Sequence, residues 1–342
     1  MGVMAYAVPY ELIRAAYEQT TLDPYSSGAL RFVLVVDADA LLSSIENHCR
    51  TGRRSRILRL ADSRNSAVFA EDHVYGETYR GLEKFAAKRG VPLDQLRTCF
   101  EEDYLPHMRW VRTDGEGIGD ARVAQVTDQT DVPTAELASL IAPCLVLSED
   151  RSLRRPGFAP EQWRVAAGHG TEVVAGAGMQ EAGTMMIGLP PVAVVGGGIK
   201  VGEKAGIPWW GSVIVLAIVG ILVLRSPQRR TVIGEKVRLV FDGLMHALEQ
   251  AYEQERAAAC QLKELLYPAS SPPTAKQQVA TILARKRQPL LAREVQGLIE
   301  VHFKEDVPTV TEVRHILQDG SEFAQPERHR WQLGRQAGPW RG

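Results

Sequence analysis

Four carboxylates lie along the first half of the chain in places where a metal site can be built. Asp37 closes the apolar run Phe-Val-Leu-Val-Val, and Asp150 follows the run Cys-Leu-Val-Leu-Ser-Glu. Glu77 lies in a segment with a helical pattern, and Asp131 precedes a predicted helix. Because open α/β sheets keep their sites at the carboxyl ends of strands, we expect these side chains to meet. Carboxylates without a His or Cys partner favour a hard cation, Mg²⁺ or Mn²⁺.

Each carboxylate also has a purely structural interpretation. An Asp that follows a strand is commonly a turn former or a helix N-cap, and Glu77 could be a solvated helix residue. Asp131 precedes Val-Pro-Thr and would cap a helix well, in which case Asp128 is the alternative ligand. The ordered set, in which strands and helices each contribute one acid, favours the metal site.

Residues 31–155 resemble the PIN domain, a ribonuclease fold found in the toxin half of many bacterial toxin–antitoxin pairs. The matching segments surround Asp37, Glu77, Asp131 and Asp150 in that order, and Ser148 occupies the family's usual hydroxyl position. The resemblance implies an α/β fold with a parallel sheet flanked by helices. It also implies that two Mg²⁺ or Mn²⁺ ions, held by the four carboxylates, serve the cleavage of single-stranded RNA. Ser148 would then support the substrate or a ligand.

A basic segment, residues 50–56, lies between Asp37 and Glu77 in the sequence. Arg53, Arg54 and Arg56 either guide an RNA backbone or form a solvated helix face. The net charge of −1 does not decide between these interpretations, because any basic surface must then be local. The four cysteines show no Cys-x-x-Cys and no zinc-finger spacing, which is typical of reduced thiols in a cytosolic protein.

A membrane segment is predicted over residues 182–224. Its stronger span, 205–224, carries no charge over about 30 Å of helix, and tryptophans stand near one end and arginines beyond the other. Residues 182–199 are also uncharged but contain Pro-Pro and Gly-Gly-Gly, so they form either a kinked first span or an apolar linker. Basic residues on both flanks favour a hairpin over a single pass, with both ends of the chain in the cytoplasm.

The rest of the chain has a helical pattern. Residues 231–267 are predicted to form a stalk that could also be a dimer seam, and the segment Tyr267–Thr274 is a predicted linker. Residues 273–336 show three helical patterns and a hairpin whose Phe323, Trp331 and Leu333 should be buried. This unit resembles a winged helix, in which Arg314 would face nucleic acid, although docking to a protein is an equal alternative.

The leading hypothesis is a membrane-tethered, metal-dependent endoribonuclease with a toxin-like or RNA-processing role. Its nuclease domain, residues 1–165, and its C-terminal domain would face the cytoplasm at the cell membrane. The expected partners are RNA, the lipid membrane, an antitoxin-like or docking protein, and a second copy bound through the PIN-like domain or the stalk. The alternative is a non-catalytic regulatory or scaffold protein with a degenerate PIN domain.

Overall fold

The computed structural model describes residues 32–188, 246, 249–250, 252–270, 272–304 and 306–336. Among these residues, no helix combines the length and the apolar character that crossing a bilayer requires. The predicted span 205–224 and the first half of the predicted stalk lie outside the described residues.

A five-stranded sheet forms the centre of the described part of the chain, in the order β4-β1-β2-β3-β8. Strand β1 (Phe32–Val36) runs parallel to β2 (Ser66–Glu71) on one side and to β4 (Leu145–Leu147) on the other. Strand β3 (Arg109–Val111) continues the parallel part beside β2, and β8 (Arg335–Gln336) pairs with β3 in the antiparallel sense. The predicted α/β class with a mostly parallel sheet is therefore confirmed.

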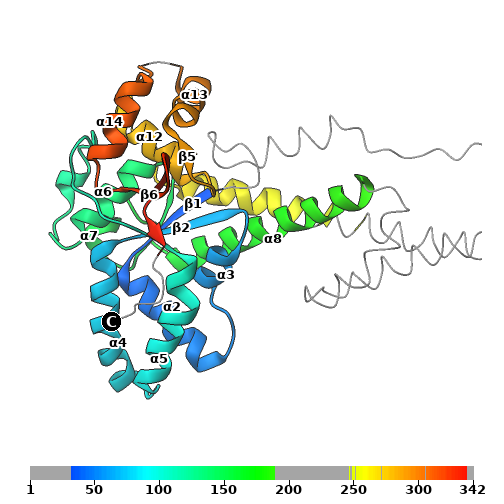
Figure 1. The fold of residues 1–342 in the computed structure, drawn as a ribbon. Helices are drawn as coiled ribbons and strands as arrows, with labels where there is room; N and C mark the ends of the chain where they lie inside the picture. Colours follow the sequence, from blue (N-terminus) through cyan, green and yellow to red (C-terminus); the bar gives the residue numbers. More distant parts are fainter. Residues whose placement is uncertain are drawn as a thin grey trace, which may run out of the picture. The chain divides into compact units, whose positions relative to one another are not determined.

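Helices cover both faces of the sheet, so β1 is buried along its whole length (Figure 1). Leu34, which is in register with Val68 and Leu145, packs into the core on one face, and Val33 and Val35 pack into the core on the other. This double burial explains the continuous apolar run in the sequence. The first face is covered by α2 (Ala38–Thr51), α3 (Arg56–Asp62), α4 (Asp72–Arg89), α5 (Leu93–Cys99) and the start of α8 (Trp163–Gly188).

Helices α2 and α4 begin at carboxylates that cap their first N–H groups and end at glycines. Asp37 accepts a hydrogen bond from the Ala38 N–H at the start of α2, and Glu71 caps α4 in a similar way. Gly52 and Gly90 end these two helices with φ of 64° and 70°, in the left-handed region that favours glycine. The two caps at the helix starts fix carboxylates directly after β1 and within β2.

The order in which the chain adds strands to the sheet reverses at β1. After β1, the chain adds β2 and then β3 on one side, and it returns to place β4 on the other side. The loops that follow β1 and β4 therefore leave their strands toward opposite faces. A crevice opens at such a switch point, which is where α/β proteins commonly bind their ligands.

The C-terminal part contains the three predicted helices and the predicted hairpin. Phe323 and Leu333 are buried as expected, whereas Trp331 is only half-buried. A short strand pairs with the hairpin to give a three-stranded sheet in the order β5-β7-β6. The elements are α12 (Ala275–Ala284), β5 (Leu290–Leu291), α13 (Ala292–Phe303), α14 (Val310–Asp319), β6 (Phe323–Glu327) and β7 (Arg330–Leu333).

These C-terminal elements share a hydrophobic core with the second face of the large sheet. Helix α12 packs against α6 (Val132–Ile141), and its Val279 and Leu283 lie in one cluster with Leu137. The described residues of the segment 257–336 consequently belong to the same compact unit as residues 32–174. The C-terminal helices thus complete the core on that face of the sheet.

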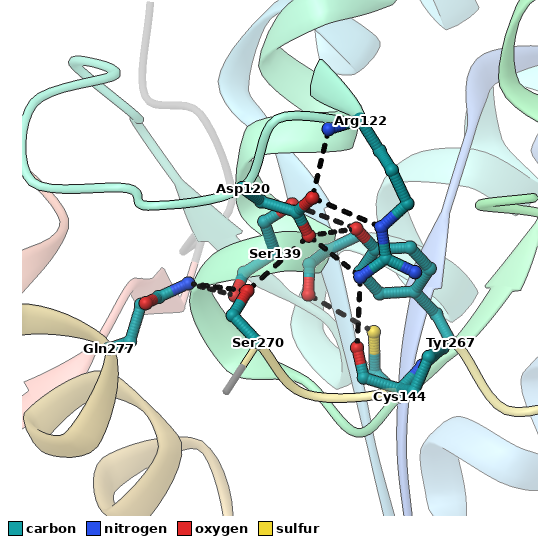
Figure 2. Close-up of polar contacts among 9 residues, drawn as sticks. Asp120, Arg122, Ser139, Cys144, Tyr267, Ser270 and Gln277 are labelled. Atoms are coloured by element: carbon teal, nitrogen blue, oxygen red, sulfur yellow. Dashed lines mark hydrogen bonds and ion pairs between the residues drawn. The ribbon is translucent and has the colours of Figure 1, made fainter. Parts of the chain in front are cut away.

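The segment predicted as a linker is held by a network of polar contacts at this junction (Figure 2). The Asp120 carboxylate accepts hydrogen bonds from the Arg122 guanidinium, from the Tyr267 hydroxyl and from Ser139 and Ser270. Tyr267 pairs through its backbone with Cys144. Although burial opposes it, hydrogen bonding from Arg122 and Tyr267 lowers the pKa of Asp120 to about 2.

The Asp120→Asn variant is expected to lose about 1.5–3 kcal/mol of unfolding free energy at neutral pH, because charged hydrogen bonds are lost. The pKa of Asp120 is lower in the folded state than its ordinary value of 3.8, so its contribution exists above that value. The difference from wild type should therefore shrink as the pH falls from about 4 to about 2. Urea unfolding at several pH values measures this, with the exposed Asp319→Asn as the control. A difference that does not change with pH would contradict the assignment.

Candidate metal centre

A cleft of about 390 Å³ opens at the switch point and contains every carboxylate in the predicted metal site. Its acidic lining comes from the loops after β1 and β4, from the start of α2, from α4 and from the loop that precedes α6. The structure therefore brings together side chains that lie far apart in the sequence. The lining carboxylates are Asp37, Asp39, Glu77, Asp128, Asp131 and Asp150.

Asp37 is the most buried of these carboxylates, with 4% of its surface exposed. Its Oδ1 accepts from the Ala38 N–H at 2.9 Å, and its Oδ2 accepts from the Ser148 hydroxyl at 2.7 Å. Burial raises the pKa of Asp37, and these two hydrogen bonds only partly oppose the rise. A nearby cation would favour the ionised form and relieve this cost.

Ser148 connects Asp37 to Asp150. Its hydroxyl donates to Asp37 and accepts from the Asp150 N–H at 2.9 Å, and its side chain is fully buried. Asp150 begins α7 (Arg151–Arg154) by accepting from the Ser152 N–H at 2.7 Å, and the residue is exposed. Ser148 thus fixes the orientation of one carboxylate and the backbone that carries another.

The Asp131 side chain does not cap the helix that it precedes, and its carboxylate lines the cleft. Although it precedes α6, its side chain makes no capping hydrogen bond, and its Oδ2 accepts from the Ser152 hydroxyl at 2.6 Å. Burial, with the nearby charges of Asp37 and Asp150, raises the pKa of Asp131 to about 6. Asp128 is exposed, and its Oδ1 accepts from the N–H and the hydroxyl of Thr130.

Asp39 lines the cleft although it was not included in the predicted ligand set. Its Oδ2 accepts from the Glu149 N–H at 2.7 Å, and its Oδ1 is buried without a hydrogen-bond partner among the described residues. Burial and the charge of Asp37 raise the pKa of Asp39 to about 7. A buried carboxylate oxygen without a hydrogen-bond partner, in a side chain whose pKa is raised, is what a position beside a cation would explain.

Helix α4 supplies the opposite wall of the cleft with both signs of charge. Glu77, Arg80 and Lys84 all line it, at the spacing that puts side chains on one helical face. Gly81 lets α4 pack closely against α2, because a Cβ at this position would collide with the side chain of Leu42 on α2. Glycine at this position lets α4 carry its charged face to the cleft.

His73 is a titratable side chain near the acidic groups of the cleft. Burial alone would lower the pKa of His73, but the hydrogen bond and the charge of Glu71, with the charges of Glu77 and Asp37, raise it. His73 lies one helical turn before Glu77, so the spacing was visible in the sequence. The sequence held no sign that Asp37 would lie near it.

The donor set suits Mg²⁺ or Mn²⁺ that keeps several of its water ligands. Among the residues that the structure describes, ligand atoms mutually within 4.8 Å occur in one group of His, Cys, Asp or Glu, and that group lies outside the cleft. The cleft carboxylates are thus too far apart to surround a single ion without other ligands. Their spacing leaves room for cations that also bind water or phosphate oxygens.

The basic residues predicted to contact RNA do not line the cleft. Arg54 forms an ion pair with Asp62, and Arg56 donates to the Arg164 carbonyl at 3.0 Å. Arg53 is exposed after the far end of α2, which carries the chain about 20 Å from Asp37. Arg314 is exposed on α14. The basic side chains that line the cleft are Arg80 and Lys84 instead.

Replacing Ser148 with Ala is expected to weaken Mn²⁺ binding about 10–100-fold, because partners that orient ligands contribute that much to metal affinity. Calorimetric titration with Mn²⁺ measures the change. Ser321→Ala removes a hydroxyl that donates to the Arg112 carbonyl outside the cleft, so it should leave the affinity unchanged. Equal affinities in the two variants would show that Ser148 has no role in the site.

In comparisons with known proteins, no family model matches the chain, and no curated protein or solved structure matches it.

Proposed function

We propose that the chain is a metal-dependent nuclease that hydrolyses the phosphodiester bonds of RNA. The observation that carries the proposal is the acidic cleft at the switch point, where carboxylates from separate elements face a wall that bears Arg80 and Lys84. The choice of single-stranded RNA rests on the resemblance of residues 31–155 to PIN ribonucleases.

Asp37, Asp131 and Asp150 would hold the cation, with Glu77 across the cleft and Asp39 as a further oxygen donor. Mg²⁺ or Mn²⁺ bound there would lower the pKa of a water nucleophile and offset charge on the phosphate. Ser148 keeps Asp37 oriented through its 2.7 Å hydrogen bond. Arg80 and Lys84 would bind phosphates of the substrate backbone.

A second hollow suggests where the substrate strand continues. It has a volume of about 330 Å³ and is lined by Arg151, Arg154, Arg155 and Glu161. Helix α7 carries two of these arginines and begins at Asp150, so the hollow starts one residue after a cleft carboxylate. Arginines near the cleft favour a polyanionic substrate over a neutral one.

The tether at the membrane remains part of the proposal. The uncharged run 205–224, with Trp209 and Trp210 near one end and Arg225 beyond the other, supports it. An antitoxin-like or docking protein and a second copy of the chain are the proposed protein partners. The C-terminal elements, with their winged-helix resemblance, are the proposed surface for nucleic acid or for a docking protein.

The proposal is tested by incubating the full chain with end-labelled single-stranded RNA. Cleavage is expected with Mg²⁺ or Mn²⁺ and not with EDTA, and it should disappear in Asp150→Asn. That variant should fold normally, because Asp150 is exposed and its cap can be kept by Asn. Absence of cleavage under every metal condition would favour a non-catalytic scaffold. Equal cleavage by Asp150→Asn would point to a contaminating nuclease.

The Arg80→Ala/Lys84→Ala double variant is expected to bind single-stranded RNA more weakly in a salt-dependent way. Each lost phosphate contact should reduce the slope of log K against log salt by about 0.7. Fluorescence anisotropy with RNA in Ca²⁺ buffer at several salt concentrations measures this slope. Lys88→Ala, an exposed lysine on the same helix outside the cleft, is the matched control. If the double variant and wild type have the same slope, Arg80 and Lys84 do not contact the RNA.

A further inference from the structure

A second cluster of metal-binding side chains lies away from the acidic cleft. His48 and Cys49 are near the end of α2, Cys99 is the last residue of α5, and Asp103 lies in the π-helical turn Phe100–Tyr104 that follows. None of these residues lines the cleft. The cluster therefore needs an explanation of its own.

The ligand atoms are close enough to share one ion. His48 Nδ1 lies 3.4 Å from Cys99 Sγ and 4.0 Å from Asp103 Oδ2, and all three atoms are within 4.8 Å of one another. Bonds of about 2.0–2.3 Å to a tetrahedral Zn²⁺ would separate such atoms by about 3.5 Å. The His48 and Cys99 atoms already have this separation, whereas Asp103 would have to move closer to His48, and its side chain is 42% exposed.

Cys49 offers a fourth donor next to Cys99, although its sulfur is outside the group of atoms mutually within 4.8 Å, so it would have to turn toward the ion. The Cys49 thiol interacts with the Cys99 thiol, and it also points to the Gln95 carbonyl on α5, 3.8 Å away. Two sulfurs, an imidazole and a carboxylate form a complete tetrahedral set. The cysteine spacing in the sequence could not reveal this set, because its members come from three separate elements.

We propose that His48, Cys49, Cys99 and Asp103 bind one Zn²⁺. Thiolate and imidazole ligands select this borderline ion over Mg²⁺ or Mn²⁺, which favour the oxygen ligands of the acidic cleft. A closed set of protein ligands is typical of structural zinc sites. The ion would join the end of α2 to α5 and to the turn after it, on the face of the sheet that α4 also covers. Its role is to hold these helices in place.

His48 is already oriented for this task. Its ring lies against the Tyr104 ring, with centroids 6.1 Å apart, and only 16% of its side chain is exposed. Tyr104 is itself fixed by hydrogen bonds with Ser44 and Ser55. Burial raises the pKa of both thiols, so Zn²⁺ would displace protons when it binds.

The test uses the full chain, purified in reductant and dialysed against Zn²⁺ or Co²⁺. We expect about one Zn²⁺ per chain by elemental analysis, and a thiolate-to-cobalt charge-transfer band in the Co²⁺ form. Cys99→Ser and Asp103→Ala should each weaken Zn²⁺ binding more than about 100-fold, since loss of an outer-shell partner alone costs up to that much. Zn²⁺ should raise the melting temperature of wild type and not of Asp103→Ala.

Two sets of controls separate this site from other sources of binding. Cys260→Ser removes an exposed cysteine outside the cluster and should keep the cobalt band. Asp37→Asn and Asp150→Asn should also keep it, which distinguishes this site from the cleft. Reduced wild type that retains no Zn²⁺, or a Cys99→Ser chain that retains it fully, would overturn the proposal. A Cys49–Cys99 disulfide, with no metal bound after its reduction, would identify a redox pair instead.

Discussion

Asp37→Asn is expected to lower metal-dependent RNA cleavage by at least about 10³-fold without lowering the stability of the metal-free chain. A bound cation contributes several kcal/mol to such reactions, and each 1.36 kcal/mol is a factor of ten. Asparagine is a poor replacement for a charged oxygen ligand, although its Oδ1 can still accept from the Ala38 N–H. Single-turnover cleavage with saturating Mn²⁺ measures the first effect.

The stability of the metal-free chain should not fall in Asp37→Asn. Burial raises the pKa of Asp37 in the folded state, so its ionised form weakens folding as the pH rises above the ordinary value of 3.8. A neutral side chain removes that cost, and the melting temperature in EDTA should stay the same or rise. If Asp37 were only a helix cap, the variant would lose stability while keeping its activity.

Arg285→Ala is expected to destabilise the folded chain by about 3 kcal/mol or more. Arg285 is 2% exposed, and its guanidinium donates to the carbonyls of Ile141, Pro143 and Thr281. Each buried carbonyl left without a donor costs about 1–3 kcal/mol. Two of these carbonyls belong to the end of α6 and its following loop, and one belongs to α12, so the loss affects both parts of the shared core.

Urea unfolding combined with hydrogen exchange measures this effect. Because the C-terminal helices share a core with the sheet, protection in β1 and in α12 should be lost in a single transition. Arg293→Ala, on an exposed face of α13, should leave the transition in place. Two separate transitions, or a loss limited to residues 275–336, would show that the two parts fold independently.

The sequence predicts the acidic site well because strand patterns place residues at the sheet edge. The apolar runs before Asp37 and Ser148 identify buried strands, and parallel strands bring their ends together. The choice between Asp131 and Asp128 could not be made in this way. Both precede the same helix, and only the Ser152 hydroxyl, which comes from another element, shows which carboxylate turns inward.

Two features depend on packing that no local sequence pattern reveals: the position of Arg80 and Lys84 in the cleft, and the core that the C-terminal helices share with the sheet. Arg80 and Lys84 reach the cleft because Gly81 lets α4 approach Leu42, a contact between distant segments. The apolar face of α12 could equally have packed within a separate C-terminal domain. Tyr267 lies in a segment rich in helix breakers, yet its contacts with Asp120 and Cys144 fix that segment.

Diffraction from crystals of the full chain soaked in Mn²⁺ would test the metal site most directly. Anomalous difference density identifies manganese without reference to any assumed ligand. We predict at least one peak in the cleft, bound by Asp37 together with Asp131 or Asp150, and no such peak in crystals of Asp37→Asn. Crystals saturated with Mn²⁺ that show no anomalous peak among these carboxylates would contradict a metal-dependent nuclease at this site.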